Sequence, residues 1–229
     1  MSKLSLNDGA ESFDVTVLEA TDPSHLVLFA VGSGGNPERH LPLLTYLAEH
    51  GCTIVAPHFE RLVSPHVVDR DLLVRARRLK LALDTVVRPG MAVAGVGHSI
   101  GATILLALAG GQVWMRPGYR LAIDPDVRLG RLVLFTPPTG FFQAPGALDA
   151  VCTPILAWTG ANDSITPPAQ AEFLTQAFGA RTPVEVRVAE GAGHFSFMNS
   201  LPPGISDSLL NREAFLAALA VEVCHFIRS

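Results

Sequence analysis

A serine flanked by two glycines is the residue of this sequence best suited to act as a nucleophile. Residues 97–101 read GHSIG, a G-x-S-x-G pattern. A strand-like run of small apolar residues, 91–96, precedes it, and an apolar helical pattern, 100–109, follows it. In a strand–turn–helix setting this pattern exposes the serine on a strained turn, next to the free N–H groups of the helix. We therefore predict acyl-transfer chemistry at Ser99; a serine that only caps the helix is the structural alternative.

A serine hydroxyl becomes a useful nucleophile only when a base accepts its proton. Downstream of Ser99 the sequence has two histidines, His194 and His225. His225 lies in a helical pattern, where a packing or surface role is expected. His194 lies in the glycine-rich segment 190–195, directly after a strand-like run, where an imidazole can face a site. We predict that His194 is the base.

These segments resemble the α/β-hydrolase superfamily, and the resemblance extends over nearly the whole chain. Members of that superfamily carry the nucleophile, the acid and the histidine in this order along the chain. The acid follows the penultimate strand in a G-x-x-D loop, and the matching segment here is TGANDSITP, residues 159–167. The resemblance implies that Asp163 holds His194 in the correct tautomer, with a plain turn aspartate as the alternative.

An oxyanion hole requires two backbone N–H donors. One is predicted at Ile100, the residue after the nucleophile. The other is predicted in GSGG, residues 32–35, which follows a strand-like run. Members of the superfamily commonly have His-Gly-x-Gly-Gly in this loop, whereas here Val31 takes the place of the histidine. Because the backbone donates the hydrogen bonds, we assign Ser33 as the second donor, with Gly34 as its nearest rival.

The elements that must position these residues alternate along the chain. Strands are predicted at residues 14–19, as an edge strand, and at 25–31, 53–57, 91–96, 131–135, 154–158 and 184–188. Helices are predicted at 37–50, 69–87, 100–109, 169–178 and 211–227. This alternation predicts an α/β fold with a mostly parallel central sheet, helices on both faces, and the site at the carboxyl ends of the strands. We expect a single α/β-hydrolase domain over residues 1–229.

Two stretches bear on how the site is covered. Residues 136–153 alone separate the predicted strands 131–135 and 154–158, which leaves no room for a large lid. Residues 111–130 show the least regular pattern of the chain. We expect them to form either a loop or a short cap over one edge of the sheet.

The composition excludes some classes of protein. A chain of 229 residues that is 48% hydrophobic and 17% charged is expected to bury a large core. Its net charge of −4 is too small to indicate nucleic acid or an anionic membrane as the main partner. A basic cluster within the helix 69–87 is expected on the solvated face of that helix. The cluster consists of Arg75, Arg77, Arg78 and Lys80.

The cysteines and the first residues indicate the compartment. The three cysteines lie far apart and show no CxxC spacing, which favours free thiols in a reducing environment. Residues 1–15 lack the apolar stretch of a secretory signal. No segment reaches the roughly 20 apolar residues that a membrane-spanning helix needs. We expect a cytoplasmic protein.

Nucleotide and metal chemistry have weaker support in the same sequence. The glycine-rich segment 32–37 lacks the lysine of a P-loop, and 95–101 is one residue off the dinucleotide-binding fingerprint. Four upstream histidines show no i, i+4 pair with a glutamate, the pattern of a helical zinc site. These are His40, His50, His58 and His66. We expect no metal and no cofactor.

The substrate expected from these features is a small molecule with an acyl group: a modest ester, thioester or lactone. Residues that could contact it are Gly34, His98, Phe59, Phe141 and Phe195. The run GAGHFSF, residues 191–197, is most similar to the dienelactone-hydrolase-like group. True dienelactone hydrolases use cysteine where this chain has Ser99, so a serine esterase is expected instead. The alternatives are a catalytically silent binding protein of the same fold, and an acyltransferase or peptidase on this scaffold.

Overall fold

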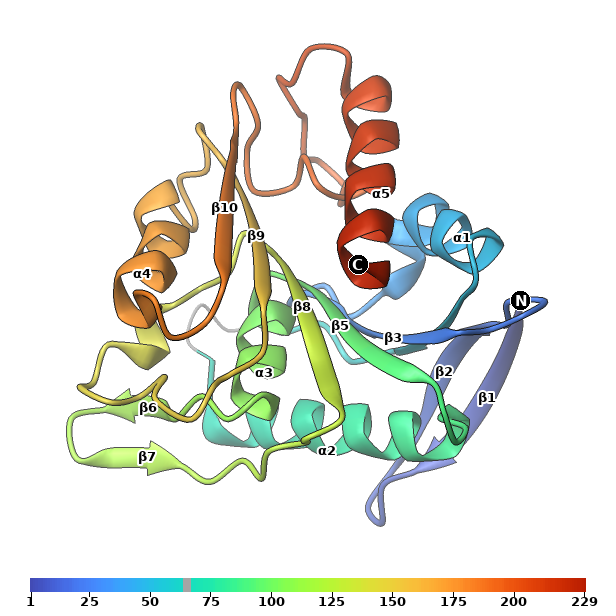
Figure 1. The fold of residues 1–229 in the computed structure, drawn as a ribbon, viewed down its shortest axis with the longest axis horizontal. Helices are drawn as coiled ribbons and strands as arrows, with labels where there is room; N and C mark the ends of the chain where they lie inside the picture. The colour runs from blue at the N-terminus through green and yellow to red at the C-terminus, as the bar shows by residue number, and fades with distance from the viewer. Residues whose placement is uncertain (64–66) are drawn as a thin grey trace.

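The computed structural model describes residues 1–63 and 67–229, so His66 lies outside the described residues. Its centre is an eight-stranded sheet with the order β1-β2-β4-β3-β5-β8-β9-β10 (Figure 1). The strands are β1 (Ser2–Asn7), β2 (Ser12–Leu18), β3 (His25–Ala30), β4 (Cys52–Pro57), β5 (Ala92–His98), β8 (Leu129–Phe135), β9 (Ile155–Gly160) and β10 (Val184–Ala189). Neighbouring strands from β4 to β10 are parallel to one another, whereas β2 is antiparallel to both of its neighbours, β1 and β4. The predicted mostly parallel sheet is confirmed.

Helices cover both faces of this sheet (Figure 1). The elements are η1 (Pro37–His40), α1 (Leu41–Glu49), α2 (Asp69–Val86), α3 (Ile100–Leu108), η2 (Gly140–Phe142), α4 (Pro168–Phe178) and α5 (Arg212–Arg228). One hydrophobic core packs under α2, α3 and α4, and a second packs under α1 and α5. The elements predicted from the periodicity of the sequence are therefore present with small shifts at their ends.

The position of β3 between two layers of helices explains why its sequence is apolar without interruption. Leu26 and Leu28 belong to the core under α2, α3 and α4, whereas Val27 and Phe29 belong to the core under α1 and α5. All four side chains are almost fully buried. Successive residues of a strand point to opposite faces, so a strand covered by helices on both sides must be apolar at every position.

The predicted edge strand 14–19 is an interior strand. The sequence prediction missed β1, which pairs antiparallel with β2 along its whole length and forms the edge of the sheet. The alternation of apolar and polar residues in β1 is short and weak, because only Leu4 and Leu6 are half-buried among exposed polar residues. Its pairing depends on a hairpin turn in which the side chain of Asn7 accepts a hydrogen bond from the Gly9 N–H at 2.7 Å.

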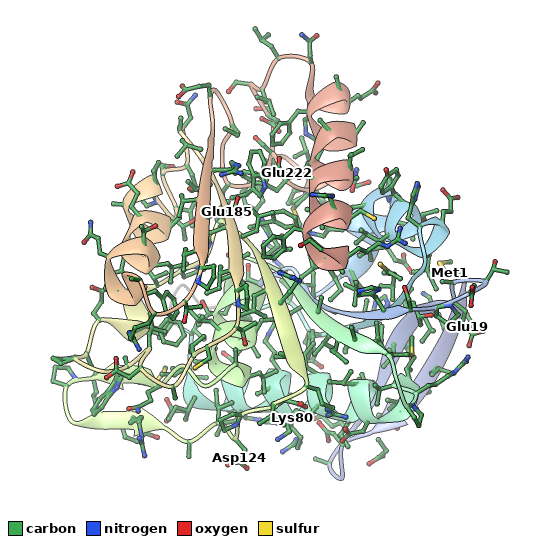
Figure 2. All side chains as sticks on the ribbon, viewed as in Figure 1. Met1, Glu19, Lys80, Asp124, Glu185 and Glu222 are labelled. Carbon is green, nitrogen blue, oxygen red and sulfur yellow. The ribbon has the colours of Figure 1, made fainter. Side chains whose placement is uncertain are left out.

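The stretch 111–130 contains a second, two-stranded sheet, formed by β6 (Val113–Arg116) and β7 (Tyr119–Leu121). It follows the C-terminal end of α3, whereas the predicted nucleophile lies at the N-terminal end of that helix. After β7, the backbone carbonyl of Asp124 accepts a hydrogen bond from Lys80 of α2 at 3.4 Å, and both residues lie at the lower edge of the view in Figure 2. The hairpin therefore lies away from Ser99 and is no cap over it.

The basic cluster of α2 contradicts the sequence prediction at two of its four positions. Arg75 is 3% exposed and Arg78 is 6% exposed. Arg78 forms ion pairs with Asp8 at 2.7 Å and Glu11 at 3.0 Å, so the turn between β1 and β2 covers it. Helical periodicity identified this side of α2 as polar, but segments distant in sequence bury it.

The connection between β8 and β9 forms no large lid over the carboxyl end of the sheet. All of its residues are described, and η2 is the one helical turn within it. The predicted absence of a large lid is confirmed. Among residues 1–63 and 67–229, no helix has both the length and the apolar character needed to cross a membrane.

Candidate active site

Ser99 lies on a strained turn between β5 and α3. Its φ of 53° and ψ of −127° belong to a region that residues with a side chain rarely adopt. The Ser99 N–H donates to the carbonyl of Phe135 on β8 at 2.9 Å, which fixes the turn against the next strand. Ser99 is partly buried, so some of the residue remains exposed to solvent. The strained turn predicted from the sequence is present.

The two glycines of GHSIG allow the backbones around Ser99 to approach closely. A Cβ at Gly101 would collide with the carbonyl of Ala30 at the end of β3. A Cβ at Gly97 would lie 2.8 Å from the backbone nitrogen of Ala102 in α3. Both distances are too short for any side chain, so α3 can pack directly on β3 and β5 only with glycine at these positions.

The imidazole of His194 lies between Ser99 and Asp163. Its Nε2 is 3.0 Å from Oγ of Ser99, and its Nδ1 is 2.9 Å from Oδ2 of Asp163. An ionised carboxylate can only accept, so Nδ1 carries the proton and donates to Asp163. Nε2 is then free to accept the proton of the Ser99 hydroxyl. The structure brings together the three residues that the sequence singled out from three separate loops.

Asp163 is buried and fully hydrogen-bonded. Its Oδ1 accepts from the backbone N–H groups of Ile165 and Thr166 at 2.8 Å each, and its Oδ2 accepts from the Thr166 hydroxyl at 2.8 Å. Burial by itself raises the pKa of Asp163, but the hydrogen bonds from His194 and Thr166 outweigh it and hold the pKa below its ordinary value. The carboxylate is therefore ionised at neutral pH.

Thr166 is a site residue that sequence reasoning missed. Its Oγ1 lies 3.0 Å from Nδ1 of His194, in addition to its contact with Asp163. The sequence contains one local signal for this region: the side chain of an aspartate in a turn often accepts hydrogen bonds from the backbone two or three residues further along. That pattern predicts the backbone contacts of residues 163–166, whereas the contact with His194 depends on the tertiary fold.

The loop that carries His194 is held by a further polar cluster. The hydroxyl of Ser196 accepts from the Gly193 N–H at 2.8 Å and donates to Oδ1 of Asp207 at 2.8 Å. Asp207 in turn pairs with Arg212 at the start of α5 at 2.9 Å. The loop of His194 is thus attached to α5 through side chains that show no motif in the sequence.

His98 does not occupy the substrate-facing position expected for it. Its side chain is buried, at 1% exposure, and its Nε2 donates to the carbonyl of His194 at 2.9 Å. Burial, together with His194 and His40 nearby, lowers the pKa of His98 well below its ordinary value, so the ring is neutral. The physical reason is the alternation along β5, which directs residue 98 into the protein when Ser99 faces the surface.

The glycine-rich loop after β3 lies against Ser99. A Cβ at Gly32 would be 3.4 Å from Cβ of Ser99 and 3.0 Å from Nδ1 of His98. Ser33 and Gly34 follow it and are exposed. Among the described residues, no backbone or side-chain acceptor receives the Ser33 N–H. Ile100 is the first residue of α3, so its N–H has no acceptor within the helix.

The three phenylalanines predicted near the substrate have different positions. Phe195 meets the ring of His194 edge-on, with the ring centres 5.1 Å apart, and is half-buried. Phe59 stacks on the guanidinium of Arg75 at 4.6 Å. Phe141 lies in η2 and packs on the core under α2, α3 and α4. The structure therefore brings Phe195 next to the base.

Within residues 1–63 and 67–229, no group of three or more histidine, cysteine, aspartate or glutamate side chains is close enough together to hold a metal ion.

Comparison by sequence identifies no relative: no protein-family model matches the chain, and no curated protein matches it. Solved structures match over nearly its whole length. A dienelactone hydrolase from Anabaena variabilis is 21% identical, with 99% of this chain and 96% of that chain covered and a TM-score of 0.69. A thermophilic esterase from Thermogutta terrifontis, solved with propionate bound, is 15% identical, with 98% and 92% covered and a TM-score of 0.69. A carboxylesterase from Lactobacillus plantarum is 16% identical, with 98% and 96% covered and a TM-score of 0.65. This chain therefore has the α/β-hydrolase fold.

Proposed function

We propose that this protein is a serine hydrolase that cleaves small esters, thioesters or lactones through an acyl-enzyme. The observation that carries the proposal is the pair of distances on the two nitrogens of His194, 3.0 Å to Oγ of Ser99 and 2.9 Å to Oδ2 of Asp163. A serine that only capped α3 would need neither a base on its hydroxyl nor a strained backbone.

In the proposed reaction, Oγ of Ser99 attacks the acyl carbonyl while Nε2 of His194 takes its proton. The carbonyl oxygen becomes an oxyanion, and the N–H groups of Ile100 and Ser33 donate hydrogen bonds to it. His194 then gives its proton to the leaving oxygen or sulfur, and the acyl group stays on Ser99. Water attacks this acyl-enzyme with His194 again as the base, which releases the acid and restores the hydroxyl.

A small substrate is supported by the openness of the site. Ser99 is partly exposed, and the β8–β9 connection carries a single helical turn. A long acyl chain gains affinity from an extended apolar tunnel, which such a surface does not supply. The structurally similar esterase from Thermogutta terrifontis was solved with propionate, a short acid, bound to it. In our proposal Phe195 provides the apolar wall beside the acyl group.

The proposal is tested with p-nitrophenyl esters of increasing chain length, run beside aminopeptidase substrates. We expect turnover of the acetate and butyrate esters, a decline for long chains, and no peptide cleavage. Ser99→Ala should lower kcat by roughly 10³–10⁶-fold, because triad residues act as a unit. Ser200→Ala, which removes an exposed hydroxyl, is the matched control and should retain full activity.

Covalent labelling gives a second readout of the same serine. Thermogutta terrifontis esterase 2 was solved phosphorylated by paraoxon. We expect paraoxon to phosphorylate this protein once, at Ser99, with the adduct located by mass spectrometry of the peptide. A folded protein that takes up no label and hydrolyses no ester would contradict the proposal and favour a binding protein of the same fold.

A further inference from the structure

Arg75 is a buried cation without an acidic partner. It is 3% exposed, and among the described residues no carboxylate lies within ion-pair distance of its guanidinium. By contrast Arg78, one turn further along α2, pairs with Asp8 and Glu11. A charged side chain is rarely buried unless it is paired, because removal of the charge from water is costly. The burial of the Arg75 charge must therefore be compensated by groups other than carboxylates.

The guanidinium is compensated by backbone carbonyls of the loops around the nucleophile. Its Nη1 donates to the carbonyls of Val31 and Gly32 at 3.1 Å each, and its Nη2 donates to the carbonyl of Glu60 at 3.2 Å. The ring of Phe59 covers it at 4.6 Å. Burial lowers the pKa of Arg75 to about 10, with Asp71 opposing the change, so the group is protonated at neutral pH. A full positive charge thus lies directly behind the loop at residues 31–35.

The carbonyl of Gly32 and the N–H of Ser33 belong to one peptide unit. In a trans peptide the two groups point in opposite directions, so a donor that fixes the carbonyl also fixes the direction of the N–H. A charge-assisted hydrogen bond to the oxygen polarises the unit and makes its N–H a stronger donor. Gly32 itself lies against Ser99, since a Cβ there would be 3.4 Å from Cβ of Ser99.

We propose that Arg75 is a positioning residue for the oxyanion hole: its buried guanidinium orients and polarises the Gly32–Ser33 peptide unit, so that the Ser33 N–H stabilises the oxyanion of the transition state. The inference rests on the proposed esterase function. Arg75 touches no substrate in this role, and it acts through the backbone of the loop. A purely structural role for Arg75 would support the loops without any preference for the transition state.

Arg75→Met removes the charge and keeps the length of the side chain. We expect kcat for p-nitrophenyl acetate to fall about 10–100-fold with KM nearly unchanged, less than the roughly 10²–10³-fold lost when an oxyanion donor is deleted outright. Affinity for a trifluoromethyl ketone, which forms a tetrahedral oxyanion on Ser99, should fall by a similar factor. Arg75→Lys restores the charge but not the fork of donors, and we expect an intermediate kcat.

Arg78→Met is the matched control, because it removes a buried arginine of the same helix that contacts the β1–β2 turn and not the loop at residues 31–35. We expect it to lower the unfolding midpoint while kcat and affinity for the trifluoromethyl ketone stay at wild-type values. If Arg75→Met does not fold, the kcat and ketone affinity of Arg75→Lys decide the question.

Two results from the variants overturn the inference even when the proposed function holds. The first is a folded Arg75 variant with wild-type kcat and wild-type affinity for the trifluoromethyl ketone. The second is a loss of kcat that is equal in the Arg75 and Arg78 variants. Either result would mean that Arg75 has a structural role only. Labelling of the wild-type protein by paraoxon at Ser99 is measured first. Absence of both labelling and ester hydrolysis there overturns the proposed function, and this inference with it, before any variant is compared.

Discussion

Four hydrogen bonds converge on the carboxylate of Asp163, and they decide what His194 can do. They come from the backbone of Ile165 and Thr166, the hydroxyl of Thr166, and Nδ1 of His194. A carboxylate supported in this way stays ionised although it is buried, which is why its pKa is low. The ionised form holds the proton of His194 on Nδ1 and leaves Nε2 to face Ser99.

Asp163→Asn tests this tautomer argument at the scale of one residue. The amide keeps the shape of the carboxylate but can present an N–H to His194, which stabilises the wrong tautomer. We expect kcat for ester hydrolysis to fall by roughly 10⁴-fold with little change in KM. The kinetics are measured beside Asp124→Asn, a change at an exposed residue before the start of β8, whereas Asp163 follows the end of β9; this control should be silent. Near-wild-type kcat in Asp163→Asn would remove Asp163 from the proposed triad.

At the scale of elements, the site depends on how closely α3 packs on the strands before it. Ser99 follows the last residue of β5 in a strained conformation, and α3 begins at the next residue. The carbonyl of Ala30 occupies the position that a Cβ at Gly101 would take. Because both partners are backbone, neither can move without shifting a whole element. The nucleophile turn is therefore a property of β3, β5 and α3 together.

Gly101→Ala is expected to disturb both stability and activity. The added methyl group forces α3 away from β3, which should cost about 1–3 kcal/mol of unfolding free energy and lower kcat by displacing Ser99. Urea unfolding and ester kinetics measure the two effects. Gly140→Ala is the control, since a Cβ there meets nothing within 4 Å and should change both quantities little. Equal unfolding free energies for the two variants would refute the packing argument.

At the scale of the whole molecule, a row of histidines crosses the interior behind the site. The ring of His98 lies 5.1 Å from that of His194 and 5.4 Å from that of His40. Burial lowers the pKa of His40 from its ordinary value of 6.5 to about 3, with Arg39 adding to the shift. The folded protein therefore holds His40 neutral at pH values where the unfolded chain protonates it.

This difference makes stability depend on pH. Between about pH 6.5 and pH 3 the unfolded chain binds a proton at His40 that the folded protein does not, so the free energy of unfolding falls as the pH falls. One such histidine contributes a slope of about 1.4 kcal/mol per pH unit well below pH 6.5. We expect His40→Phe to reduce the slope by that amount between pH 6 and pH 4, measured by urea unfolding. Parallel curves for His40→Phe and the wild type would contradict the prediction.

The sequence by itself determined the alternation of strands and helices, the turn around Ser99, and the loops that carry Asp163 and His194. These features are local: apolar periodicity reports which face of an element is buried, and glycines and turn residues mark where the chain must bend. The order of segments along a parallel sheet then brings the loops at its carboxyl edge together. For that reason Ser99 and His194 could be predicted as partners without coordinates, whereas Asp163 was predicted from the resemblance to the α/β-hydrolase superfamily.

Only the tertiary structure decided which polar side chains enter the interior. Arg78 meets Asp8 across 70 positions of sequence, and Arg75 meets Gly32 across 43. No pattern within a helix reports a partner so distant, so both arginines were predicted to lie in solvent. The alternation along β5 directs His98 away from the side of Ser99, and only the tertiary structure supplies the carbonyl of His194 that accepts its hydrogen bond. A polar side chain is buried only where hydrogen-bond or ion-pair partners surround it, and folding is what brings those partners together.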